Sequence, residues 1–195
     1  MIIVFRRTGQ RRYSIEARRS EFPDVVMDPA PGFDKLIPHD LMHLVVEAQL
    51  GLTRGVFGQL AAGGDAGTFH LPVQHDKSTR ETARARSRIK TRGAKLSKEG
   101  REESARSERA TYICWYEWLA RSQSSELRKR AQTMAGNAEQ VRDAADAAEL
   151  RAIGQKRLDE ICGYLDRLSS HWSSLKVGQS MAVRWPDLTI VSVGT

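Results

Sequence analysis

The amino-acid sequence predicts an α+β protein, with a predominantly helical body and a small antiparallel sheet at one side. Two observations predict this class. Both ends of the chain alternate apolar and polar residues as strands do, and the long middle carries apolar residues at helical spacing. A sheet built from the N-terminal hairpin and the C-terminal strands would tie the termini together. A length of 195 residues fits a single domain, residues 1–195, with a basic arm or linker at 76–101.

The first 19 residues predict a β-hairpin. Residues 2–5 are β-branched or aromatic, residues 8–10 supply a turn, and from Tyr13 onward apolar and polar residues alternate. A lone hairpin is marginal in water, so we expect another strand or a helix to cover it. Residues 20–35 contain three prolines and predict an irregular connection with a short strand at 25–27.

Residues 37–60 have the clearest helix punctuation in the chain. Pro38 suits the first helical position, where its missing N–H costs nothing, and Gly51 suits a left-handed cap at the end. Thr53 is expected to cap a second short helix at about residues 54–62. The first helix is apolar nearly all round, so we expect it to be buried.

One side of that first helix carries candidate metal ligands. His39, His43 and Glu47 recur at i, i+4 and i+8, which lines them up along one face. Two imidazoles and a carboxylate can hold one divalent cation, zinc above all, as an H-E-x-x-H helix does. In the alternative interpretation, the histidines hydrogen-bond to neighbouring elements and Glu47 pairs with an arginine.

A cation on this helix would indicate a metal-dependent hydrolase, because a bound metal lowers the pKa of its water. Glu47 is then the third ligand or the general base. Asp40 is the second candidate catalytic residue, since it takes the place of the general-base glutamate of zinc peptidases, although its shorter side chain lies farther from a metal-bound water. In the glycine-rich loop that follows, His70 and His75 either complete the ligand set or are solvated.

The positive charge is concentrated in one stretch. The formal net charge is +7, and residues 76–101 hold ten basic and three acidic residues, which accounts for the whole excess. Such a segment is a mobile arm or a solvated helix. It supports an alternative function, a non-enzymatic binding module whose arm contacts nucleic acid or an acidic protein partner. The residues expected to make the contact are Arg84, Arg86, Arg88, Lys90 and Arg92.

Residues 102–134 favour one long helix or two, with an aromatic-rich centre. Glu117 is a carboxylate among these aromatic residues. It is either a further metal ligand or acid/base group with a raised pKa, or the ion-pair partner of Arg121 one turn later.

The C-terminal third predicts two more helices and the closing strands. Gly136 and Asn137 indicate a break before a helix at 138–150. Residues 153–175 are strongly amphipathic, and their apolar stripe packs on the core or, in a third hypothesis, forms the seam of a homo-oligomer. Alternation resumes in residues 181–193, where one or two strands fit.

The cysteines and the N-terminus indicate a cytoplasmic protein. Cys114 and Cys162 lie far apart inside helical patterns, as small buried hydrophobic residues do in a reducing compartment. The apolar run at residues 2–5 precedes the arginines, which reverses the order of a signal peptide. No apolar stretch approaches the roughly 20 residues of a membrane helix, so we expect no membrane partner.

Residues 38–64 resemble uncharacterised bacterial proteins that share a P-H-D-L-x-H-x-x-V-E core, a likeness that implies no particular activity. The H-D-x-x-H part, from His39 to His43, also resembles the zinc motif of a family of ubiquinone-biosynthesis proteins. That motif adds a glutamate twelve residues after the second histidine, and this sequence has Gly55 there.

Overall fold

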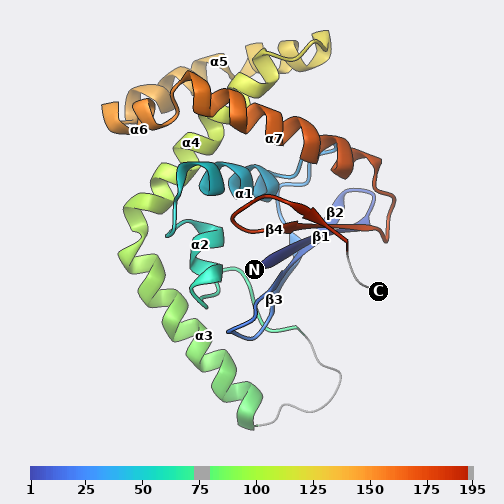
Figure 1. The fold of residues 1–195 in the computed structure, drawn as a ribbon, viewed down its shortest axis with the longest axis vertical. Helices are drawn as coiled ribbons and strands as arrows, with labels where there is room; N and C mark the ends of the chain where they lie inside the picture. Colours follow the sequence, from blue (N-terminus) through green and yellow to red (C-terminus); the bar gives the residue numbers. More distant parts are fainter. Residues whose placement is uncertain (73–79, 193–195) are drawn as a thin grey trace.

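A five-stranded antiparallel sheet ties the two ends of the chain together (Figure 1). The computed structural model describes residues 1–72 and 80–192. The strands are β1 (Ile2–Gly9), β2 (Arg12–Arg18), β3 (Val25–Ala30), β4 (Ser180–Arg184) and β5 (Ile190–Val191). Their order in the sheet is β3-β2-β1-β4-β5. The predicted α+β class, with its sheet of N-terminal and C-terminal strands, is therefore confirmed.

The central position of β1 follows from its sequence. Its apolar run forms backbone hydrogen bonds with a neighbouring strand on each edge. Ile3 pairs with Ala17 of β2 and with Val183 of β4. All three side chains are fully buried, because alternate residues of neighbouring strands point to the same face of a sheet. This face belongs to the same apolar core that the helices line.

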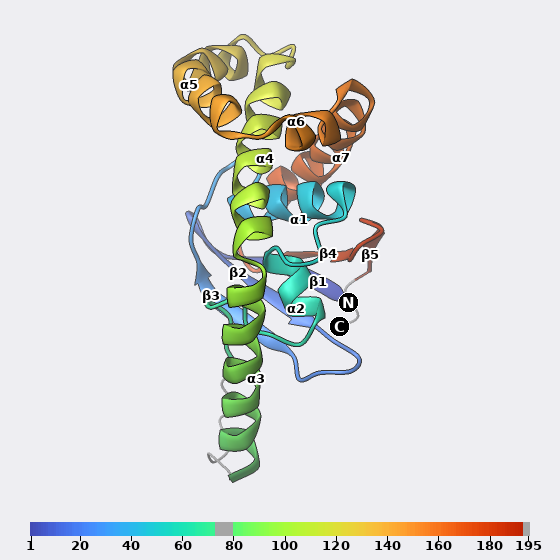
Figure 2. The same cartoon turned by 90° about the vertical axis from the view of Figure 1, so that its left-hand side faces the viewer.

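Most helices gather on that side of the sheet, and α3 (Arg80–Glu99) runs past the sheet and beyond it (Figures 1 and 2). The other helices are α1 (His39–Leu50), α2 (Val56–Ala61), α4 (Arg101–Ala120), α5 (Ser125–Ala144), α6 (Ala147–Ala152) and α7 (Gln155–Ser174). No helix among the described residues is both long enough and apolar enough to cross a membrane.

Helix α1 lies at the centre of the helical layer and contacts α2, α4 and α7. Its predicted burial is confirmed, since every residue from Leu41 to Glu47 is buried. Gly51 ends the helix in the left-handed conformation with a φ of 65°, as expected. Pro38 was expected at the first helical position, but it is the N-cap residue, one position before α1 begins at His39.

Two predicted helix boundaries are wrong. Thr53 does not cap α2, which begins after Gly55 and has no cap from its own flanking side chain. The break at Gly136 and Asn137 is also absent, because α5 continues from residue 125 to 144. A glycine in an exposed helix costs only about 1 kcal/mol, and packing on α4 outweighs that preference.

Helices α3 and α4 form one long column broken only at Gly100 (Figure 2). Of the two forms considered for the basic segment, residues 80–99 adopt the helix, and residues 76–79 lie outside the described residues. The amphipathic stripe of α7 packs inward as predicted, with Leu158, Ile161 and Leu165 buried in the core. These side chains are therefore not exposed for an oligomer seam.

Candidate metal centre

His43 is the buried residue around which the site is built. It projects from the middle of α1 toward α4, and only 3 % of its surface is exposed. On one side of the ring, Nδ1 lies 3.0 Å from Oγ of Ser107 and 3.3 Å from Oγ1 of Thr111, both on α4. Ser107 and Thr111 are one helical turn apart, so both face α1. Two hydroxyl groups thus hold the orientation of the ring.

Glu47 lies behind this first side of His43 and is fully buried. Its carboxylate accepts hydrogen bonds from the backbone N–H groups of Val56 and Phe57, at 2.8 and 2.9 Å, and from Oγ of Ser107 at 2.9 Å. The first two donors open α2, where unpaired N–H groups attract a negative charge. Glu47 therefore caps α2, the role predicted for Thr53.

Gly55 makes room for this carboxylate. A Cβ atom on Gly55 would lie 2.2 Å from Oε1 of Glu47, far inside van der Waals contact. The glycine that departs from the ubiquinone-biosynthesis motif is thus required by the path of the Glu47 side chain.

The hydrogen bonds around Ser107 fix the tautomer of His43. Ser107 has one hydroxyl proton and donates it to Glu47, so its oxygen is left to accept a hydrogen bond from Nδ1–H of His43. A neutral imidazole with its proton on Nδ1 carries a lone pair on Nε2. A neutral ring of this tautomer presents a ligand atom on its other side, whereas a protonated ring directs Nε2–H toward Glu108.

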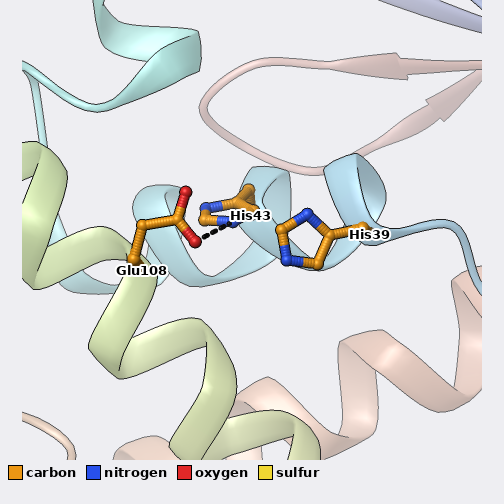
Figure 3. Close-up of side chains that lie close together, drawn as sticks. All are labelled: His39, His43 and Glu108. Carbon is orange, nitrogen blue, oxygen red and sulfur yellow. Dashed lines mark ion pairs between the residues drawn. The ribbon is translucent and has the colours of Figure 1, made fainter. Parts of the chain in front are cut away.

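That ligand atom, Nε2 of His43, is buried and has no hydrogen-bond partner among the described residues. It lies 3.4 Å from Oε2 of Glu108 on α4, with which it forms an ion pair when the ring is protonated (Figure 3). The His39 ring stands edge-on to His43 at 4.6 Å between ring centroids. One ligand atom from each of the three residues lies within 4.8 Å of the other two. His39 and Glu108 are exposed, so this side of His43 opens to solvent.

The structure does not bring Glu47 together with His39. Positions i and i+8 are about 12 Å apart along a helix and point about 80° apart, so two such side chains diverge. Of the three ligands expected from the sequence, His39 and His43 meet, and Glu108 from α4 stands where Glu47 was expected.

Charge and burial compete over the protonation of these groups. Burial lowers the pKa of His43, but Glu108, Glu47 and Asp40 together raise it above its ordinary value. The neighbouring His43 lowers the pKa of Glu108 and keeps that carboxylate ionised. Burial lowers the pKa of His39, and His43 adds to the effect, which favours the neutral ring that a metal needs. Burial also raises the pKa of Glu47 against the opposing effect of its hydrogen bonds.

Asp40, the second predicted catalytic residue, has its carboxylate bonded to Tyr13 of β2. The Tyr13 hydroxyl also lies 2.5 Å from the carbonyl oxygen of Pro31. Burial raises the pKa of both Asp40 and Tyr13, which favours their neutral forms. Asp40 thus links α1 to the sheet and is not one of the three grouped ligands.

The other candidates lie elsewhere. His70 is exposed, and its backbone pairs with Val26 at the edge of β3. His75 lies outside the described residues. Glu117 forms ion pairs with Arg121 and Arg142, which agrees with the ion-pair interpretation. The basic residues Arg84, Arg86, Arg88, Lys90 and Arg92 are all exposed on α3.

Sequence reasoning missed Glu108 because it lies 65 positions after His43. The one available signal was weak. Ser107 and Thr111 are polar residues at helical spacing that lead into an apolar helix, and buried polar residues of this kind need a partner. The partner's identity depends on how α1 and α4 cross.

Comparison with models of known protein families gives no match to this chain. Comparisons with curated proteins and with solved structures give none either.

Proposed function

We propose that this protein binds a divalent metal ion, with His39, His43 and Glu108 as its ligands. The observation that carries the proposal is the buried Nε2 of His43, which faces Glu108 and His39 and has no hydrogen-bond partner among the described residues. In the neutral ring this nitrogen has a lone pair and receives no hydrogen bond from the Glu108 carboxylate, which costs about 1–3 kcal/mol of lost hydration. A metal ion at this point would compensate for that loss.

Zinc fits the donor set best. Zinc takes imidazole nitrogen and carboxylate oxygen at about 2.0–2.2 Å, so neighbouring ligand atoms of a tetrahedral site lie about 3.3 Å apart. The 3.4 Å between Nε2 of His43 and Oε2 of Glu108 is close to that separation. The widest separation is at most 4.8 Å, and a rotation of the exposed His39 side chain can shorten it.

The shell around His43 supports the same proposal. Metal-binding histidines usually donate their second N–H to a fixed acceptor, which sets the tautomer and the ring plane. Ser107 and Glu47 supply that acceptor chain here.

Three protein ligands leave a fourth tetrahedral position for water, as in catalytic zinc sites. Hydrolysis would also need a base near that position. The two carboxylates expected to serve, Asp40 and Glu47, are bonded to Tyr13 and to the start of α2. The proposal therefore covers metal binding and leaves the reaction unassigned.

Elemental analysis and zinc titration of the purified protein test this function. We expect one equivalent of zinc per chain, lost in His43→Ala and in His39→Ala. His171→Ala is the matched control, since it removes an exposed histidine at the far end of α7. His39 is exposed, so its replacement leaves the core intact. A wild-type protein that takes up no zinc, or a His39→Ala variant that binds it as tightly as the control, would refute the proposal.

A further inference from the structure

Helix α3 carries most of the chain's excess charge on its surface. It holds eight basic and two acidic residues, a formal charge of +6 out of a total of +7. All eight basic side chains are exposed. Positive charges packed this densely repel one another and attract polyanions, so a polyanionic partner would stabilise this surface.

The helix is anchored to the body along one face only. Ile89 and Gly93 are its buried residues. At Gly93 the backbone of α3 lies directly against the loop that contains Asp65. A Cβ atom added to Gly93 would lie 1.9 Å from Oδ1 of Asp65. Toward its N-terminal end, α3 extends past the rest of the molecule (Figures 1 and 2). Its outer side is therefore open to a large ligand.

The basic residues form two rows on the flanks of this outer side. At about 100° per residue, Arg84 and Arg88 lie on one flank, and Arg86 and Lys90 lie on the other. The Arg84 flank also borders a hollow that it shares with Asp24 and Leu71 of the body. Small residues fill most of the strip between the rows. They are Ala83, Ser87, Thr91 and Ala94.

Among the described residues, these four basic side chains have no ion-pair partner. At the C-terminal end of the same helix, by contrast, Glu99 pairs with Arg54 at 2.7 Å and with Lys95 at 3.8 Å. In the described part of the chain, ion pairs thus form at the C-terminal end of α3 and not at these four residues.

We propose that α3 binds double-stranded DNA by entering the major groove, with the two basic rows on the phosphates of the two strands. A helix with its side chains is about 10–12 Å across, and the major groove of B-form DNA is about 12 Å wide. Small residues on the leading strip let the helix approach the groove floor. Arginine predominates in the rows, and its planar guanidinium binds phosphate through two parallel hydrogen bonds.

The composition of α3 argues against other polyanions. A protein partner needs apolar or aromatic anchors, and the large apolar residues of α3, Ile89 and Leu96, are buried or half-buried. Single strands bind by stacking on aromatic side chains, and α3 has none. The major groove of double-stranded RNA is too narrow for a helix.

Fluorescence anisotropy with a labelled 20-base-pair DNA duplex and the full-length protein tests the proposal. The variant replaces Arg84, Arg86, Arg88 and Lys90 with glutamine, which preserves helix propensity. The control replaces four exposed basic residues elsewhere with glutamine and has the same net charge. They are Lys129, Arg151, Lys156 and Arg157. If the four α3 side chains contact phosphates, wild-type affinity should fall about 10²-fold between 50 and 200 mM salt, and that of the variant should stay nearly constant.

The control should keep the wild-type salt dependence. Equal loss of affinity in the two variants would overturn the proposal, because it would mean that only net charge matters. Single-stranded DNA, an RNA duplex of the same sequence or poly-glutamate should each bind more weakly than the DNA duplex. Equal or tighter binding of any of these three would equally refute groove binding.

Discussion

Glu47 and Glu108 lie on opposite sides of the same imidazole, and their surroundings differ completely. Glu47 is fully buried and accepts three hydrogen bonds from fixed donors. The Glu108 side chain is 65 % exposed, and its one contact in the site is an ion-pair distance of 3.4 Å to Nε2 of His43. The first carboxylate is held inside the fold, whereas the second is mostly exposed and pairs only with His43 among the described residues. Side-chain chemistry is identical in the two cases, so the donors around each carboxylate decide its role.

Removal of Glu47 should have the largest effect on folding. Glu47→Ala leaves the first N–H groups of α2 unpaired in the core and takes the acceptor from the Ser107 hydroxyl proton, so we expect a loss of about 3–5 kcal/mol of unfolding free energy. Glu108→Ala should lose no more than about 1 kcal/mol, because its side chain is mostly exposed. Urea unfolding of the metal-free variants measures the two losses of unfolding free energy. Similar losses in the two variants would remove the distinction between these carboxylates.

Gly55→Ala should disturb the same buried carboxylate without changing Glu47 itself. The new Cβ would displace Glu47 from its donors, so we expect a loss of about 1–3 kcal/mol. Gly136→Ala is the matched control, since no atom lies within 4 Å of its added Cβ. The control should gain about 0.5–1 kcal/mol from better helix propensity. Thermal unfolding of the two variants gives the comparison, and a stable Gly55→Ala protein would contradict this account of Glu47.

Ser107→Ala tests how the two sides of His43 are connected. Without the Ser107 oxygen, Nδ1 keeps only the longer contact with Thr111, and the ring loses the acceptor that sets its tautomer. We expect zinc affinity to fall about 10- to 100-fold while the three ligands remain. Zinc titration calorimetry measures it, with Ser173→Ala on the exposed end of α7 as the control. Unchanged affinity would mean that the Ser107–Glu47 chain has no part in metal binding.

Local sequence patterns predicted most of the fold. Alternation gave the hairpin and β4, and the glycine after Leu50 gave the end of α1. Errors arose where tertiary packing outweighed a local preference. Gly136 remains helical because α5 lies along α4, and α2 starts late because its cap comes from Glu47, a residue on the preceding helix.

The site was only half predictable for a related reason. His39 and His43 are one turn apart on one helix, so spacing alone brings them together. Glu47 continues that spacing, but the distance along α1 and the donors at α2 direct its carboxylate away from His39. Glu108 enters through the contact between α1 and α4, which no local pattern encodes.

Zinc titration calorimetry of Glu108→Gln tests the central claim most directly. Glutamine preserves the shape of the exposed side chain and removes the anionic ligand. We predict that its zinc affinity falls at least about 100-fold, while the stability of the metal-free protein stays within about 1 kcal/mol of wild type. Glu139→Gln, an exposed change on α5, should bind zinc as the wild type does. Wild-type zinc binding by Glu108→Gln would show that Glu108 is not the third ligand and would contradict the account.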